Sequence, residues 1–247
     1  MQESIYNIKC VIEYDGSRYA GFQVQPNEIT IESELLRVLN LICKEEIKIY
    51  GSGRTDRGVH AKGQVFNFFT HNHIPLDRFM YAFNRQLPLD IRVLSMEYVD
   101  LNFHARFSAV KKEYRYYLKQ IPLNAFEHNY MAFSKKLDLN LVQNALKLLE
   151  GRHNFEGFCS VDVDKRKDFE KEIYEASVKE TNDILEFKFI GSGFLKYQIR
   201  RMMALIIAIG LKEEKLETIT KILETRDPFV YTKVADPSGL YLMHVYY

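Results

Sequence analysis

The hydrophobic residues of this chain change their spacing many times, and this alternation constrains the fold more than any other feature. A period of two indicates strands, whereas apolar residues three or four apart indicate helices. The strand-like stretches are residues 5–14, 47–50, 63–70, 91–99, 109–118 and 240–246, and a hairpin at 172–179 and 184–190 turns at 181–183. The helix-like stretches are residues 32–46, 76–86, 140–149, 194–210 and 216–224.

This order predicts an α+β fold with two similar halves. Each half is expected to contain a mainly antiparallel sheet with helices packed on one face. The two sheets are expected to join around a central active-site cleft. We place the halves at residues 1–105 and 106–247.

Composition excludes several classes of protein. The longest apolar stretch, residues 202–209, has eight residues, whereas a membrane span needs about 20. Three scattered cysteines and the lack of a secretory signal argue against a disulfide framework and favour a reducing cytoplasm. The net charge is +1, so nucleic acid is a plausible partner only if the basic residues are segregated.

The glycine-rich loop at residues 51–61 has the sequence GSGRTDRGVHA and joins two predicted strands. It could be a plain tight turn, in which Asp56 accepts local N–H bonds. It is not a P-loop, because no Lys-Ser/Thr pair follows the glycines and no helix begins there. Arg54 and Arg57 flank Asp56, and neighbouring guanidinium groups favour an ionised carboxylate. Such a carboxylate can act as a nucleophile, and the same arginines could hold a phosphate.

Basic residues also gather with aromatic rings at residues 104–119, HARFSAVKKEYRYYLK. Rings between basic residues can stack on bases while the cations follow an RNA backbone, although a solvated strand face would look the same. Arg200 lies on a largely apolar helix face, where it needs a buried carboxylate partner or reaches solvent. His71 and His73 lack further ligands at a suitable spacing, so we predict no metal site.

A family resemblance follows from these segments in order. GRTDRGVHAKGQVFNF at residues 53–68 resembles the signature of the tRNA pseudouridine synthase A family. Six other segments match the family in the same order along nearly the whole chain. They are YDGSRYAGFQVQP at 14–26, LPLDIRV at 87–93, FHARFSAVKKEYRYYL at 103–118, GRHNFEGF at 151–158, GSGFLKYQIRRM at 191–202 and GLYLMHVYY at 239–247.

The resemblance implies a cofactor-free isomerase that converts uridine to pseudouridine in the anticodon stem-loop of tRNA, at one or more of positions 38, 39 and 40. It implies that Asp56 is the catalytic aspartate and that Tyr114 packs on the target base. Arg54 would help to hold out the target nucleotide, Arg200 would pair with the aspartate, and Leu240 would form an apolar wall. The resemblance also implies a cytoplasmic homodimer that binds tRNA across both subunits. For RNA contacts we expect Arg57, His60, Lys62, Arg106, Lys111 and Arg115.

The chain departs from the usual family pattern near this site. Phe22 replaces a Trp, Arg57 an Ala, Arg201 an Asn and Ala204 a Gly, and Lys171-Glu172 stands where Arg-Thr is usual. The two additional arginines would suit a different RNA. Two alternatives therefore stay open, namely an enzyme of the same fold that acts on ribosomal RNA and an RNA-binding paralogue without turnover. The choice between attack at C1′ and attack at C6 also stays open.

Overall fold

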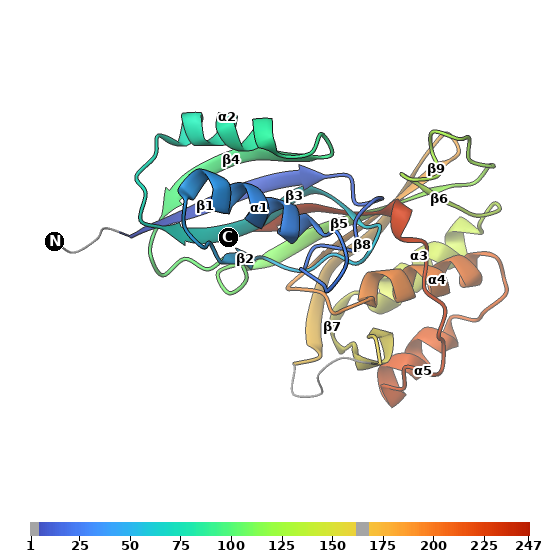
Figure 1. The fold of residues 1–247 in the computed structure, drawn as a ribbon. Coiled ribbons are helices and arrows are strands. Elements are labelled where there is room, and N and C mark those ends of the chain that lie inside the picture. The colour runs from blue at the N-terminus through green and yellow to red at the C-terminus, as the bar shows by residue number, and fades with distance from the viewer. Residues whose placement is uncertain (1–4, 162–167) are drawn as a thin grey trace. The chain divides into compact units, whose positions relative to one another are not determined.

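The structure, a computed structural model, describes residues 5–161 and 168–247. The chain forms two compact units, Met1–Val110 with Leu242–Tyr247, and Lys111–Tyr241. Both units combine helices with mainly antiparallel strands (Figure 1), which confirms the α+β class that the periodicity predicts.

The limits of the units differ from the halves that we placed at residues 1–105 and 106–247. The first unit continues to Val110 and regains the end of the chain. Hydrogen bonds explain this grouping, because the Val110 N–H donates to the Tyr246 carbonyl at 2.9 Å. The Tyr247 hydroxyl likewise donates to the Ala105 carbonyl at 2.8 Å. Strand β10 (Leu240–Tyr246) therefore begins in the second unit and ends in the first.

The first unit is organised around strand β1 (Tyr6–Tyr14), which lies between two antiparallel neighbours. They are β3 (His60–Thr70) and β4 (Ile91–Val99). The short strand β2 (Ile49–Gly51) pairs with β3, and the loop between them holds Asp56. Alternate residues of β1 are buried from Ile8 onward, as the period of two predicts, whereas β3 is buried along nearly its whole length.

Two helices cover one face of these strands, α1 (Ile31–Cys43) and α2 (Leu76–Gln86) (Figure 1). Thr30 begins α1 with a reciprocal cap, since its side chain accepts from the Ser33 N–H and the Ser33 hydroxyl accepts from the Thr30 N–H. Helix α2 contributes Phe79, whose ring meets the Phe68 ring of β3 edge to face at 6.0 Å.

The second unit contains four antiparallel strands, β5 (Lys111–Lys119), β7 (Gly151–Asn154), β8 (Glu170–Thr181) and β9 (Ile184–Gly191). Their order in space is β5-β9-β8-β7. Strand β6 (Ala132–Phe133) pairs with β5 in parallel. The β8–β9 hairpin confirms the predicted one, and Asn182 at its turn has a φ of 55°.

Helices α3 (Leu139–Leu149), α4 (Gln198–Gly210) and α5 (Glu217–Thr225) complete the second unit. Almost every residue of α4 is buried, which explains its apolar stretch. The sequence predicted that this helix begins at residue 194, but it begins at Gln198 because Tyr197 has a left-handed conformation with a φ of 65°. Two short 3-10 helices also occur. The first, η1 (Glu156–Phe158), follows β7, and the second, η2 (Pro237–Gly239), directly precedes β10. None of the helices in the described residues has the length and hydropathy of a membrane span.

Candidate active site

The loop between β2 and β3 is fastened to its own hairpin at the start. The Ser52 N–H donates to the Val65 carbonyl at 2.7 Å, and the buried Ser52 hydroxyl donates to Gln64 Oε1 at 2.6 Å. Gln64 Nε2 donates to the Gly53 carbonyl at 3.2 Å. Gln64 of β3 therefore fixes the entry to the loop that carries Asp56.

The middle of the loop is held by the segment after β1. The Thr55 hydroxyl shares a buried hydrogen bond of 2.8 Å with the Tyr14 hydroxyl, and the Thr55 carbonyl accepts from the Phe22 N–H at 3.0 Å. Gly21 has a φ of 103°, and a Cβ there would lie 2.7 Å from the Thr55 carbonyl oxygen. Burial raises the pKa of Tyr14, so its phenol stays protonated at neutral pH. Sequence reasoning missed both Tyr14 and Gly21, although they lie in the first matching segment.

Asp56 itself is half-buried at the start of a turn. Its carbonyl accepts from the Val59 N–H at 3.1 Å, and Gly58 in this turn has a φ of 77°. Arg54 and Arg57 are exposed. The Arg57 guanidinium pairs with Glu28 at 2.7 Å, so a carboxylate other than Asp56 offsets its charge.

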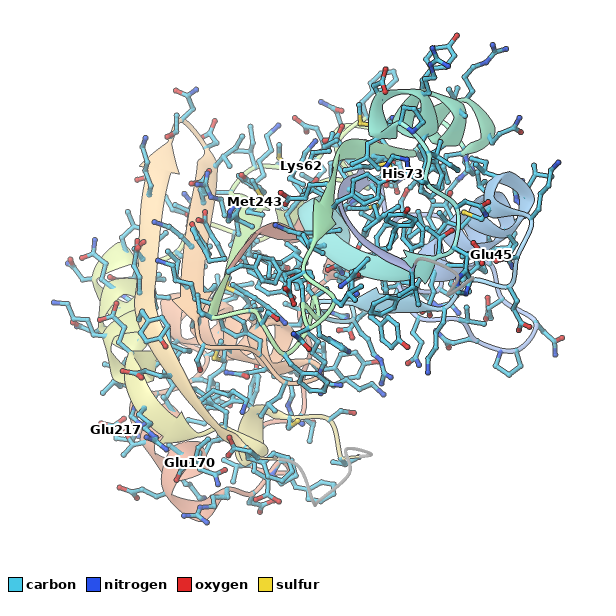
Figure 2. The ribbon with its side chains drawn as sticks, turned by 90° about the vertical axis from the view of Figure 1, so that its left-hand side faces the viewer. Glu45, Lys62, His73, Glu170, Glu217 and Met243 are labelled. Carbon is cyan, nitrogen blue, oxygen red and sulfur yellow. The ribbon has the colours of Figure 1, made fainter. Side chains whose placement is uncertain are left out.

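His60 and Lys62 behave differently although both were expected to contact RNA. The His60 side chain is only 2% exposed, and its Nδ1 accepts from the Gly16 N–H at 3.1 Å. His60 therefore fixes the end of the loop to the segment after β1. A direct contact of His60 with RNA, which the sequence predicted, is not expected because the ring is buried. Lys62 is exposed and its ammonium lies 3.6 Å from Glu13. Figure 2 shows Lys62 close to Met243, whose carbonyl lies against Gly63.

In the second unit, Tyr114 lies on β5 opposite Phe189 of β9. Its side chain is buried, and its ring meets the Phe194 ring edge to face with centroids 5.3 Å apart. This aromatic neighbour restricts the orientation of the Tyr114 ring. The packing is consistent with a fixed aromatic surface at this end of β5.

Arg200 and Leu240 are positioned by the same segment before β10. Arg200 Nε donates to the Ala235 carbonyl at 2.9 Å, and the Ala235 N–H donates to the Arg200 carbonyl at 3.0 Å. The Arg200 guanidinium lies 5.2 Å from the Tyr197 ring centroid. Leu240 is buried at the start of β10, directly after η2. The Tyr116 hydroxyl donates to the Asp236 carbonyl at 3.0 Å and so holds the start of this turn.

Arg201 is buried within the second unit, which corrects the hypothesis that it suits a different RNA. Its side chain is almost fully enclosed, and its guanidinium donates to the carbonyls of Cys159 at 2.6 Å, of Tyr231 at 2.5 Å and of Pro228. Burial lowers the pKa of this guanidinium from its ordinary value. Arg201 thus joins α4 to two other backbone segments, at Cys159 and at residues 228–231, and is not available to phosphate.

The remaining basic residues that we expected to contact RNA differ in their exposure and in the side chains around them. Arg106 is exposed in the first unit and lies 5.6 Å from the Phe107 ring centroid. Lys111 is partly exposed at the start of β5 and lines a cavity of about 420 Å³ with Tyr174. Arg115 is 32% exposed and pairs with Glu113 at 2.9 Å and Glu186 at 3.2 Å. Two carboxylates offset the charge of Arg115, which weakens it as a phosphate contact.

Comparison with known proteins gives extensive matches. A family model described as tRNA pseudouridine synthase matches residues 10–108 and 145–247. A protein of Exiguobacterium named tRNA pseudouridine synthase A is 43% identical over 241 residues, covering 97% of each chain. Proteins of the same name from Geobacillus and Bacillus subtilis are 41% and 40% identical over 245 residues, which cover 97% of this chain and 98% of theirs.

Likeness to solved structures is much weaker. A chain of a Cbf5-Nop10-Gar1 complex is 11% identical over 81% of this chain and 54% of that chain, with a TM-score of 0.35. The sequence matches, by contrast, reach into both units and cover nearly the full length of the relatives. This chain therefore belongs to the tRNA pseudouridine synthase family.

Proposed function

We propose that this protein is a tRNA pseudouridine synthase, an isomerase that converts uridine to pseudouridine in the anticodon stem-loop of tRNA. Its proposed targets are one or more of positions 38, 39 and 40. Family membership supports the reaction. The observation that carries the proposal in this chain is the anchoring of the Asp56 loop by Tyr14, Gly21 and Gln64.

The reaction exchanges one bond of the nucleoside for another without any redox change. The C1′–N1 bond breaks, the uracil turns, and a C1′–C5 bond forms. The proton on C5 then leaves and N1 gains a proton, so the product is an isomer of the substrate. An ionised Asp56 can assist by adding to C1′ or to C6 and leaving again. Asp56 is the only carboxylate within residues 51–63, and backbone hydrogen bonds hold the loop that carries it. The proposal requires neither a metal nor a cofactor.

The target base has to leave its stack before this chemistry, at a cost of a few kcal/mol. We assign the stacking surface to Tyr114, whose ring is oriented by Phe194. Arg54, exposed on the same loop as Asp56, would occupy or hold the space of the extruded nucleotide. Arg200 would pair with Asp56, and the buried Leu240 would form an apolar wall of the pocket.

For the wider RNA surface we propose Arg57, Lys62, Arg106 and Lys111, with a smaller contribution from Arg115. The first three are exposed, and Lys111 is partly exposed. We further propose a homodimer in the cytoplasm. The family resemblance and the bacterial relatives named for tRNA modification support the proposed RNA surface, the homodimer and the cytoplasmic location.

Substitution of Asp56 by Asn tests the catalytic assignment. The variant keeps the shape and the hydrogen-bonding capacity of the side chain but removes its charge, so turnover should be lost while tRNA binding remains. The measurement is tritium release from tRNA that contains 5-³H-uridine, next to filter binding. Asp77→Asn, in an exposed position on α2, is the matched control and should react like wild type.

The substrate assignment is tested by mapping pseudouridine in total RNA from cells with and without the protein. Loss of pseudouridine at anticodon stem-loop positions is expected. Loss of pseudouridine only in ribosomal RNA would show that the substrate is ribosomal RNA and not tRNA. Near-normal tritium release by Asp56→Asn would remove Asp56 from the catalytic role.

A further inference from the structure

The segment between β4 and β5 is fastened to the first unit by buried polar side chains. Asn67 Oδ1 accepts from the Ala105 N–H at 2.9 Å, and Asn7 Nδ2 donates to two carbonyls of the segment, at 2.8 and 2.9 Å. The two asparagines are themselves joined at 2.9 Å. They alternate along their strands with core residues such as Ile8 and Phe68, so the segment lies on the face opposite α1 and α2.

This fixed segment presents side chains outward, next to residues around β2. His104 and Phe107 have ring centroids 4.4 Å apart, and His104 meets Tyr50 at 5.1 Å. The cations lie at the two ends, with Arg106 5.6 Å from the Phe107 ring and Lys48 5.2 Å from the Tyr50 ring. We call these five residues, Lys48, Tyr50, His104, Arg106 and Phe107, the cation–aromatic platform.

The cation–aromatic platform is exposed to solvent, unlike a cluster of side chains that packs in the core. The Phe107 side chain is 76% exposed, and Arg106 and Lys48 are also exposed. Hydrogen bonds to buried asparagines hold the backbone of the segment that carries His104, Arg106 and Phe107. A binding surface prepared in this way loses less conformational entropy when a partner arrives.

The composition of the platform indicates the chemistry of its partner. Its residues include two cations and three rings but no carboxylate. Exposed rings between cations match the arrangement that binds single-stranded nucleic acid, where bases stack on rings and cations contact phosphates. Protein interfaces are also enriched in aromatic residues and arginine but are depleted of lysine, so Lys48 is the residue of the platform that favours nucleic acid over protein.

We propose that the cation–aromatic platform binds an unpaired stretch of the RNA substrate, with a base stacked on Phe107 and phosphates near Arg106 and Lys48. The proposal rests on the proposed function for its RNA partner. It adds a second stacking site that is separate from the proposed target-base contact of Tyr114.

The test compares Phe107→Ala and Phe107→Tyr with a matched pair elsewhere in the same unit. Tyr81 on α2 is 66% exposed and has the Arg85 guanidinium 5.8 Å from its ring, so Tyr81→Ala removes a similar exposed ring next to an arginine. Affinity is measured by fluorescence anisotropy with an unmodified tRNA transcript and with a blunt RNA duplex that has no unpaired bases.

Phe107→Ala should bind the tRNA roughly 5-fold or more weakly, the effect of losing one stacked base. Phe107→Tyr keeps a ring and should bind like wild type, as should Tyr81→Ala. Affinity for the duplex should not change. Arg106→Ala should lower the slope of log K against log salt by about 0.7, the value for one contact with a single strand.

Unchanged tRNA affinity in Phe107→Ala would overturn the proposal. An equal loss for tRNA and duplex would also overturn it, because stacking requires unpaired bases. If Phe107→Ala instead becomes a monomer at a concentration where the wild type is a dimer, the platform is a contact between copies of the chain. Tritium release by the wild type reports on the proposed function separately, because it does not depend on the Phe107 variants.

Discussion

Replacement of Arg201 by Met tests whether this arginine is a structural residue of the second unit. Methionine keeps an unbranched apolar stem but removes the guanidinium that donates to the carbonyls of Cys159, Pro228 and Tyr231. Residues 228 to 231 precede Ala235, which exchanges hydrogen bonds with Arg200. Loss of the guanidinium should therefore loosen the segment that orients Arg200.

The expected change in the free energy of unfolding follows from two opposing contributions. Each hydrogen bond from a charged donor contributes about 1.5–3 kcal/mol, so three give at most about 9 kcal/mol. Removing the buried charge also removes its desolvation penalty, which is several kcal/mol. Carbonyls 228 and 231 lie outside the helices and strands and regain water on a small movement. We therefore expect the free energy of unfolding to fall by about 2–4 kcal/mol.

Urea unfolding followed by far-UV circular dichroism measures this change, since the chain has no tryptophan to report by fluorescence. With a slope of about 2 kcal/mol per molar urea, the midpoint should fall by roughly 1–2 M. Arg152→Met is the control, because Arg152 is 73% exposed and its pair with Glu170 should contribute less than about 1 kcal/mol.

The reasoning is refuted if Arg201→Met unfolds at the same urea concentration as Arg152→Met. A second readout separates structure from RNA contact. The salt dependence of tRNA binding should keep its slope in Arg201→Met, because a buried guanidinium releases no counterion. A lower slope with unchanged stability would place Arg201 on the RNA.

Three further predictions concern the proposed site and its loop. Tyr114→Phe should retain tritium release and Tyr114→Leu should lose it if only the ring is needed, whereas loss in both would show that the hydroxyl takes part and full activity of the Leu variant would remove Tyr114 from the site. Arg57→Ala should lower the salt slope by less than about 0.9, because Glu28 already offsets its charge at 2.7 Å, and an unchanged slope and RNA ranking would make Arg57 a plain surface residue. Gly21→Ala should destabilise the protein by about 1–3 kcal/mol in urea unfolding and reduce turnover, because the φ of Gly21 is 103° and the new Cβ would lie 2.7 Å from the Thr55 carbonyl oxygen. Gly193→Ala is the control and should be tolerated, because the atom nearest to its new Cβ lies 3.9 Å away.

The sequence by itself determined the elements whose residues repeat over several turns or strand positions. Strands β1, β3 and β4 and helices α1 and α2 lie close to their predicted ranges, because alternation and helical spacing are local properties. The short strands β6 and β7 were missed, since β6 has only two residues and β7, with the sequence GRHN, has no apolar side chain. The start of α4 was placed too early because nothing in the local pattern reveals the left-handed Tyr197.

The local pattern also singled out the Asp56 loop, because one carboxylate among glycines and arginines is visible without a fold. It did not reveal what holds that loop. Tyr14 and Gly21 reach Thr55 from far away in the sequence, and only the folded chain brings these backbones together.

Charge was the property that the sequence predicted least well, because the effect of a basic residue depends on its partners and burial. His60 and Arg201 looked like RNA contacts but are enclosed within their units. Arg115 was expected to contact RNA, but the antiparallel register brings Glu186 of β9 within 3.2 Å of it. Sequence fixes which residues carry charge, whereas strand register and packing decide which charges meet solvent. The reason is that both depend on residues distant along the chain.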